Sequence, residues 1–176
     1  MEVPNLQILI DGCLKDDRDS QKQIYDLYKD AMYSVCFRIC GNYDDAKDAL
    51  QEGFIEVFRC INAFRAESSL GAWIKTIMVR RAIRKLKKLR FEEISVNLQE
   101  PVEFDSEISG DELHKAILML DEGYRSVFVL YEVEGYSHRE ISIMLKISEG
   151  TSKSQLHYAK KKLQSILQKI YGYERY

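Results

Sequence analysis

The stretch GYSHREISIMLKISEGTSKSQLHYAKKKL, residues 135–163, predicts two short helices joined by a tight turn. Ser137 stands where a helix N-cap belongs, and Glu140 completes an S-x-x-E capping box, so the first helix should begin at His138. An apolar stripe at helical spacing follows, and residues 146–148 interrupt it before the next helix opens. A turn of about three to four residues between two helices is the spacing of a helix-turn-helix.

The second of these helices has an apolar face and a polar, basic face. On a helical wheel one sector of roughly 100° should face a core; its residues are Leu156, Ala159, Leu163, Ile166, Leu167 and Ile170. The wheel turns a second set outward, namely Lys153, Ser154, His157, Tyr158 and Lys161. Such groups suit phosphates and base edges in a major groove. A solvated lysine face would explain residues 160–162 equally well, but the preceding helix and turn favour nucleic acid.

Composition narrows the class of protein. The chain has 176 residues and only two prolines, and six glycines fall near the ends of helix-periodic segments, which predicts an all-α fold; they are Gly41, Gly71, Gly110, Gly123, Gly135 and Gly150. No apolar run approaches the roughly 20 residues that span a bilayer. The N-terminal residues lack the basic and apolar regions of a signal peptide. We therefore expect a cytoplasmic protein with no segment inserted in a membrane.

Cysteine spacing gives no pairing pattern for the four thiols, which are Cys13, Cys36, Cys40 and Cys60. A metal pair or redox switch at Cys36 and Cys40, one helical turn apart, is one interpretation. Burial is the favoured one, because small thiols beside an apolar helix stripe usually pack in a core. That stripe consists of Ile24, Leu27, Tyr28, Ala31, Val35 and Ile39. We expect no metal site and no cofactor.

The net charge of −2 hides a strong segregation of charge along the chain. Residues 75–90 carry eight basic residues and no acidic one, whereas residues 92–112 carry eight acidic residues and no basic one. On a wheel the cations of the basic segment occupy an arc of about 160° opposite an apolar face. A phosphate backbone is the favoured partner of this cationic face; the alternatives are an anionic membrane surface or no partner at all.

The acidic segment also divides the chain. It contains Pro101 and Gly110 and has no helical periodicity, so it predicts a linker over residues 92–111. Helical patterns precede it at residues 19–40, 44–61 and 69–88, and others follow at residues 112–120 and 124–133, before the helix-turn-helix. Each side can close a small core of its own. We therefore expect two helical domains, residues 1–91 and 112–176.

Four blocks in order resemble one known family. They are DALQEGFIEVF at 48–58, AFRAESSLGAWIKTI at 63–77, LDEGYRSVFVLYEVEGYSHREISIMLKIS at 120–148 and EGTSKSQLHYAKKKL at 149–163. The chain is similar to a group IV, or extracytoplasmic function, sigma factor of bacterial RNA polymerase. The third-region domain of larger sigma factors has no counterpart, because only the acidic linker occupies its place.

The resemblance implies a polymerase-binding surface in the first block. There the family docks on the clamp helices of the largest polymerase subunit, and carboxylates can pair with arginines of a partner helix. The predicted polymerase-binding residues are Asp45, Asp48, Gln51, Glu52 and Glu56. An acidic solvated face with no partner is the alternative. Leu50, Phe54, Val57 and Phe58 are expected in the domain core.

The resemblance also implies that the loop at residues 62–69 receives a base flipped from the minus-ten element. A pocket for an unstacked base needs polar edges and an apolar wall. The candidates are Asn62, Phe64, Arg65, Glu67 and Ser68. Trp73 corresponds to a family tryptophan near the point where the duplex opens, although a core anchor is an equal interpretation. The residues expected to hold promoter phosphates are Arg80, Arg81, Arg84, Lys85 and Lys88.

The helix-turn-helix corresponds to the part of the family that meets the minus-thirty-five element. The predicted contact residues are Lys153, Ser154, Gln155, His157, Tyr158 and Lys161. Gln155 and Tyr158 stand where many relatives have arginine, and Arg80 stands where many have asparagine. Since glutamine favours adenine and arginine favours guanine, we expect a less guanine-rich element if Gln155 reaches a base.

The expected function is therefore that of a sigma factor, which binds core RNA polymerase, recognises promoter DNA and helps open the duplex without catalysis of its own. An anti-sigma factor is an expected partner, and the free chain is expected to be a monomer. Two alternatives stay open. A stand-alone helix-turn-helix regulator would bind a two-fold symmetric site as a dimer. A small helical enzyme would need a carboxylate site, for which Asp45, Asp48 and Glu52 are the candidates.

Overall fold

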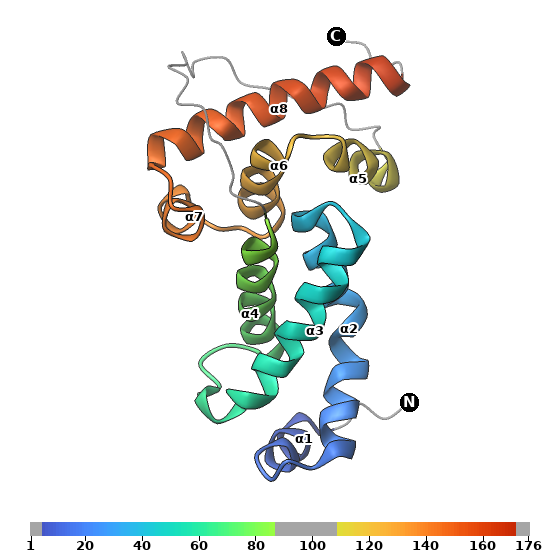
Figure 1. Cartoon of the computed structure of the whole chain (residues 1–176), viewed down its shortest axis with the longest axis vertical. Helices are drawn as coiled ribbons and strands as arrows, with labels where there is room; N and C mark the ends of the chain where they lie inside the picture. The colour runs from blue at the N-terminus through green and yellow to red at the C-terminus, as the bar shows by residue number, and fades with distance from the viewer. Residues whose placement is uncertain (1–4, 87–108, 172–176) are drawn as a thin grey trace. The chain divides into compact units, whose positions relative to one another are not determined.

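The computed structural model describes residues 5–86 and 109–171, and within these ranges every regular element is a helix (Figure 1). The α-helices are α1 (Leu6–Cys13), α2 (Arg18–Cys40), α3 (Tyr43–Arg59), α4 (Leu70–Lys85), α5 (Gly110–Leu118), α6 (Glu122–Phe128), α7 (His138–Leu145) and α8 (Glu149–Tyr171). A 3-10 turn, Ile61–Ala63, follows α3, and a π-helix, Val129–Val133, follows α6. The predicted all-α class is confirmed. None of the described helices is long and apolar enough to cross a bilayer.

The chain divides into two compact units. One consists of Met1–Phe37 and Asn42–Lys85, and the other of Arg38–Gly41 and Leu86–Tyr176. Helices α1 to α4 therefore lie in the first unit, apart from the last residues of α2, and α5 to α8 lie in the second. Most of the predicted linker lies outside the described residues. Gly110 and Asp111, which were assigned to the linker, begin α5 instead, because Ser109 and Glu112 form a capping box there.

The first unit is built on the packing of α3 against α4, which lie side by side (Figure 1). Gly53 allows a close approach, because a Cβ at this position would lie 2.2 Å from the Sδ of Met78 on α4. The predicted core residues of α3 are correct for the buried Leu50, Phe54 and Val57, and Phe58 is half-buried.

Helix α2 buries only part of the predicted stripe: Ile24, Val35 and Ile39 are buried as expected. Leu27, 48% exposed, and Ala31 are not in the core, whereas Met32 is buried. The buried face is centred near Met32, Cys36 and Ile39, and at 100° per residue Leu27 and Ala31 point well away from that centre. Cys36 consequently lies within the buried face of α2. Cys13, Cys36 and Cys40 are buried, as favoured from the sequence, and Cys60 is half-buried.

The second unit packs α8 against α5, α6 and α7. Ser137 and Glu140 form the predicted capping box, so α7 begins at His138 as expected. Lys146, with a left-handed backbone (φ 57°), ends α7 and sets the tight turn before α8. Of the residues expected to line the core of α8, Ile170 is 47% exposed. It lies in the last turn, where a helix end has fewer neighbours than a wheel assumes.

Candidate nucleic-acid interface

The loop between α3 and α4 presents the side chains predicted to receive a base. Asn62, Arg65, Glu67 and Ser68 are all exposed. The loop ends at Ser69, whose hydroxyl accepts a hydrogen bond from the backbone N–H of Ala72 at 3.2 Å and thereby caps α4. These residues therefore form a polar, accessible edge at the start of a helix.

An aromatic pair adjoins this polar edge. The rings of Phe64 and Trp73 lie 5.6 Å apart between centroids and are tilted by 55°. Both side chains are half-buried, so Trp73 is neither a fully buried anchor nor a solvent-exposed ring. An apolar wall beside exposed polar groups is what an unstacked base requires.

The basic residues of α4 fall into two groups. Arg80 and Arg84 are exposed, and the structure gives neither an ion pair within its described part. Arg81 and Lys85 are only 24% and 21% exposed at their side chains, because both pair with carboxylates of α3. This corrects the prediction that all of these cations share one outer face. Lys88 lies outside the described residues.

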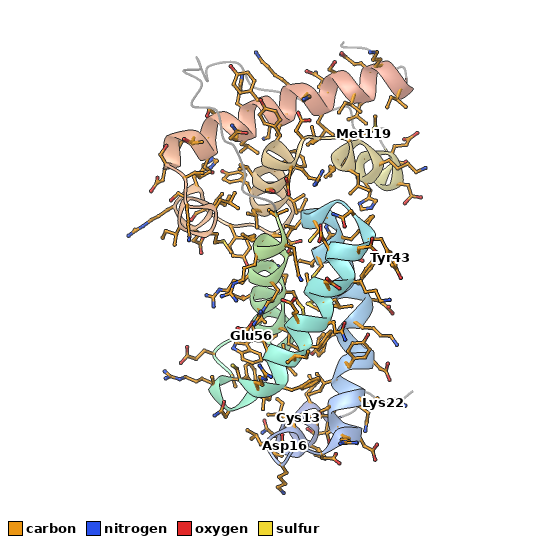
Figure 2. The ribbon with its side chains drawn as sticks, viewed as in Figure 1. Cys13, Asp16, Lys22, Tyr43, Glu56 and Met119 are labelled. Carbon is orange, nitrogen blue, oxygen red and sulfur yellow. The ribbon has the colours of Figure 1, made fainter. Side chains whose placement is uncertain are left out.

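The ion pairs join residues that were predicted to bind different partners. Lys85 Nζ lies 2.6 Å from Glu52 Oε1 and 3.5 Å from Asp48 Oδ2. Arg81 pairs through Nη1 with Glu52 Oε2 at 3.4 Å and through Nε with Glu56, which Figure 2 labels on α3. The hydrogen bond from Lys85 lowers the pKa of Glu52, and the same bond raises the pKa of Lys85. Charges expected to face DNA and polymerase thus neutralise each other inside the first unit.

The remaining predicted polymerase-binding residues differ in how accessible their side chains are. The amide of Asn42 donates to Asp45 Oδ2 at 2.7 Å, and its oxygen accepts the backbone N–H of Asp45 at 2.9 Å, so Asp45 is engaged with the N-cap residue of α3. Asp48 is 62% exposed at its side chain, and Gln51 is exposed. Asp48 and Gln51 are therefore the most accessible members of the predicted set.

Several side chains in the N-terminal half of α8 are less exposed to solvent than the helical wheel predicts. Lys153 and Lys161 are exposed, but Ser154, Gln155 and His157 are buried, and Tyr158 is half-buried. A wheel gives the direction in which a side chain leaves the helix but not what covers it. The hydroxyl of Ser154 turns back to donate to the Thr151 carbonyl at 3.0 Å, which keeps this short side chain against its own helix.

The two rings of this face make further contacts. Tyr158 packs against Tyr124 of α6 with ring centroids 6.3 Å apart, and against the ring of His157 at 5.8 Å. His157 Nε2 is buried and has no hydrogen-bond partner within the described part of the chain. The prediction that Ser154, His157 and Tyr158 all stand free on the outer face is therefore wrong for the resting chain.

The lysine run at residues 160–162 is partly internal. Lys160 pairs with Glu132 of the π-helix at 2.6 Å. Lys162 pairs with Asp121, and its Nζ lies 5.3 Å from the centre of the Tyr124 ring. These two lysines pair with residues outside α8, so the lysine run is not a fully solvated face.

A contact that the sequence did not predict joins the two helices of the helix-turn-helix. His138 Nδ1 and the Ser152 hydroxyl form a hydrogen bond of 2.8 Å, and the His138 ring stacks on Tyr131 at 4.4 Å. Burial lowers the pKa of His138, and the charge of Lys153 lowers it further. The sequence pattern does not reveal this contact, because His138 and Ser152 lie on different helices and meet only once the turn between them has folded.

Comparison with known proteins finds two matching family models. The family model described as Sigma-70 region 2 matches residues 24–92, and the model described as Sigma-70, region 4 matches residues 110–163. The chain is 28% identical over 174 residues to the ECF RNA polymerase sigma factor SigW of Bacillus subtilis (strain 168), across 89% of this chain and 93% of that protein. It is also 28% identical over 169 residues to the RNA polymerase sigma factor YlaC of the same strain, across 90% and 98%.

A solved structure shares the fold. It is the co-crystal structure of the sigma factor RpoE in complex with the anti-sigma factor NepR from Bartonella quintana, matched with a TM-score of 0.52 and 22% identity across 84% of this chain and 96% of that chain. The two family models together span both helical units in the order expected from the sequence. The chain belongs to the sigma-70 family, as a sigma factor of its extracytoplasmic function group.

Proposed function

We propose that this sigma factor binds core RNA polymerase, directs it to promoters through two separate DNA contacts, and helps open the duplex by holding an unstacked base. The domain at residues 1–91 would carry polymerase and minus-ten binding, and the domain at residues 112–176 would carry minus-thirty-five binding, with residues 92–111 between them. The chain itself performs no catalysis and acts where the polymerase acts, in the cytoplasm.

One observation carries the minus-ten part of the proposal. The exposed polar residues of the loop at 62–69 adjoin the half-buried pair of Phe64, in the same loop, and Trp73 of α4. Extruding a base costs a few kcal/mol of lost stacking, which a ring face can partly restore. In this role Phe64 and Trp73 supply the apolar wall, and Asn62 and Arg65 supply hydrogen-bonding groups for the edge of the base.

Exposed cations supply the phosphate contacts. Arg80 and Arg84 follow the aromatic pair along α4, and both are accessible. A guanidinium can contact two phosphate oxygens at once, so two exposed arginines one helical turn apart suit a nucleic-acid backbone. We assign the phosphate contacts of the first domain to these two residues.

Recognition of the minus-thirty-five element would begin at Lys153, which is exposed in the first turns of α8. Gln155 and His157 are buried in the resting chain and would have to be uncovered to reach base edges. The unpartnered Nε2 of His157 could then receive a hydrogen-bond partner from DNA. Tyr158, held against Tyr124, would contribute its ring and hydroxyl at the edge of this surface.

Polymerase binding would use the exposed side of α3. Asp48 and Gln51 are accessible there, and a partner helix bearing arginines could approach them without disturbing the core. An anti-sigma factor would compete for surfaces of this chain, as the complex of a relative of the same fold with NepR suggests. The free chain is proposed to be a monomer.

The test combines binding and transcription. The tagged chain is mixed with purified core RNA polymerase, and the recovered complex is assayed by run-off transcription on genomic fragments. We expect stoichiometric polymerase binding and start sites that depend on the chain and disappear in Arg80→Glu/Arg84→Glu. Lys22→Glu, an exposed cation on α2 (Figure 2), is the matched control and should keep them. Specific DNA binding without polymerase binding would instead support a stand-alone helix-turn-helix regulator.

A further inference from the structure

Two cations and three carboxylates form a continuous ion-pair ladder between α3 and α4. Along α3 the carboxylates Asp48, Glu52 and Glu56 lie one turn apart, and along α4 the cations Arg81 and Lys85 lie one turn apart. Each cation sits between two carboxylates, so that Glu52 is shared by both. Higher positions on α4 pair with lower positions on α3, which is the order expected of antiparallel helices.

The ladder occupies a different line along α4 from the DNA-contacting groups. At 100° per residue, Trp73, Arg80 and Arg84 fall within a sector of about 40°, and Arg81 and Lys85 lie about 100° further round the helix. The aromatic that adjoins the base pocket and the two exposed arginines thus share one stripe. A rotation of α4 about its axis would move all three together, whereas the ladder opposes such a rotation.

The cations and the carboxylates of the ladder differ in how far their side chains are exposed to solvent. Arg81 and Lys85 are covered to more than three quarters, while the carboxylates are more exposed at their side chains, at 32% for Glu56, 44% for Glu52 and 62% for Asp48. The cations are therefore less accessible than the carboxylates with which they pair. Phosphates approaching Arg81 or Lys85 would meet these carboxylates first, which is unfavourable for direct contact.

We propose that Arg81 and Lys85 are positioning residues for promoter binding, which hold α4 in register on α3 so that Trp73, Arg80 and Arg84 face the DNA, and that neither contacts a phosphate. This inference rests on the proposed function. The sequence predicted one DNA-binding surface for the basic segment. The proposal divides this surface into a stripe that contacts DNA, with Arg80 and Arg84, and a stripe that supports the helix, with Arg81 and Lys85. It also gives Glu52 and Glu56 a role within the chain in addition to any contact with polymerase.

Adjacent arginines provide the matched variants for the test. Holoenzyme is assembled from core polymerase and the full chain carrying Arg80→Met or Arg81→Met, and its affinity for a promoter duplex is measured from about 50 to 200 mM salt. Each lost phosphate contact lowers the slope of log affinity against log salt by about 0.9. We expect this decrease for Arg80→Met. For Arg81→Met we expect a several-fold loss of affinity at every salt concentration with the slope of the wild type.

Rescue separates positioning from a merely structural role. Arg81→Lys keeps one ammonium within reach of Glu56 or Glu52 and should recover most of the affinity. Lys85→Met is a second variant and should behave as Arg81→Met does. A slope reduced by about 0.9 in Arg81→Met would show direct phosphate contact and overturn the proposal. Wild-type affinity and slope in a less stable Arg81→Met protein would overturn it as well.

A double-mutant cycle tests the ladder without polymerase. Unfolding by denaturant is compared for the wild type, Arg81→Met, Glu56→Gln and the double variant of the full chain. We expect the double variant to be clearly less destabilised than the sum of the single variants, since the residues are in contact. Additive effects would contradict the ladder. Failure of the proposed function would be visible separately, as a wild-type chain that gives polymerase no promoter affinity. This result would overturn the positioning role, whereas the energetic coupling between Arg81 and Glu56 in the unfolding experiment would remain.

Discussion

Acidification should weaken the helix-turn-helix through one histidine. His138 begins α7 and reaches across the turn to Ser152 of α8, with a hydrogen bond of 2.8 Å. Its ring also stacks on Tyr131 of the π-helix. The charged groups that influence it are Lys153 and Glu149 of α8 and Glu132 of the π-helix. Burial and the nearby Lys153 lower the pKa of His138 in the folded chain, so the neutral ring is the folded form.

The direction and size of the effect follow from linkage. Because the folded pKa lies below the ordinary value of 6.5, the unfolded chain takes up the proton first as the pH falls. The stabilisation is complete above pH 6.5 and is lost as the pH decreases toward the folded pKa. One titrating group can change the free energy of unfolding by at most about 1.4 kcal/mol per pH unit. A loss of about 1 kcal/mol, which is within that limit, would lower the Tm of a small domain by about 4–8 °C.

The assay must report on the second unit alone. Hydrogen–deuterium exchange followed by mass spectrometry compares peptides of α7 and α8 with peptides of α3 at pH 7.5 and pH 5.5, after correction for intrinsic exchange rates. We expect the protection of α7 and α8 to fall at pH 5.5, and that of α3 to change less. Trp73, the single tryptophan of the chain, lies in the first unit, so its fluorescence follows that unit separately.

Two histidine variants make the test decisive. His138→Gln keeps a hydrogen-bonding group near Ser152 but cannot titrate, so its α7 and α8 peptides should lose much less protection on acidification. His114→Gln, in α5 of the same unit, should retain the loss of the wild type. The reasoning would be refuted if His138→Gln lost protection between pH 7.5 and 5.5 as fully as the wild type does.

Three further substitutions probe the fold and the DNA contact. Leu163→Ala removes a fully buried side chain of α8 and should lower the free energy of unfolding of the second unit by about 2–5 kcal/mol in denaturant titrations; a loss below about 1 kcal/mol would contradict its place in the core. Asn42→Ala removes the N-cap of α3 and should cost about 0.5–2 kcal/mol, whereas an unchanged unfolding midpoint would show that the cap is dispensable. Lys153→Met should lower the salt slope of promoter affinity by about 0.9, while Lys162→Met should leave it unchanged because Lys162 is already paired; equal slopes for the two variants would refute this distinction.

Local signals in the sequence are sufficient to place several helix boundaries. The S-x-x-E pattern at Ser137 fixes the start of α7 because a capping box involves only residues within one turn. The same reasoning, applied to Ser109 and Glu112, would have placed the start of α5, but the acidic composition of the surrounding segment favoured a linker. Helix α1 was not predicted, because its eight residues offer too short a window for a periodic signal.

The predicted faces are less accurate than the predicted helices, and for a common reason. A wheel orders side chains around one axis, but the partner of a long charged side chain depends on the neighbouring helix. Arg80 and Arg81 are chemically identical neighbours in the sequence, yet one is exposed and the other is enclosed by Glu52 and Glu56. Only the packing of α3 on α4 distinguishes them, and Gly53, which permits that packing, gives no sign of its role in the sequence.

Internal pairing also bears on how a chain with a net charge of −2 can act on DNA. Arg81, Lys85, Lys160 and Lys162 pair with carboxylates of their own unit, so these four cations are less available to DNA phosphates. Each domain then contributes few phosphate contacts, and since every contact adds to affinity, each domain alone should bind promoter DNA weakly. Two weak contacts become strong when both are held on one polymerase, because binding of the first raises the effective concentration of the second. Pairing within the units therefore favours DNA binding that depends on the assembled holoenzyme over binding by the free chain.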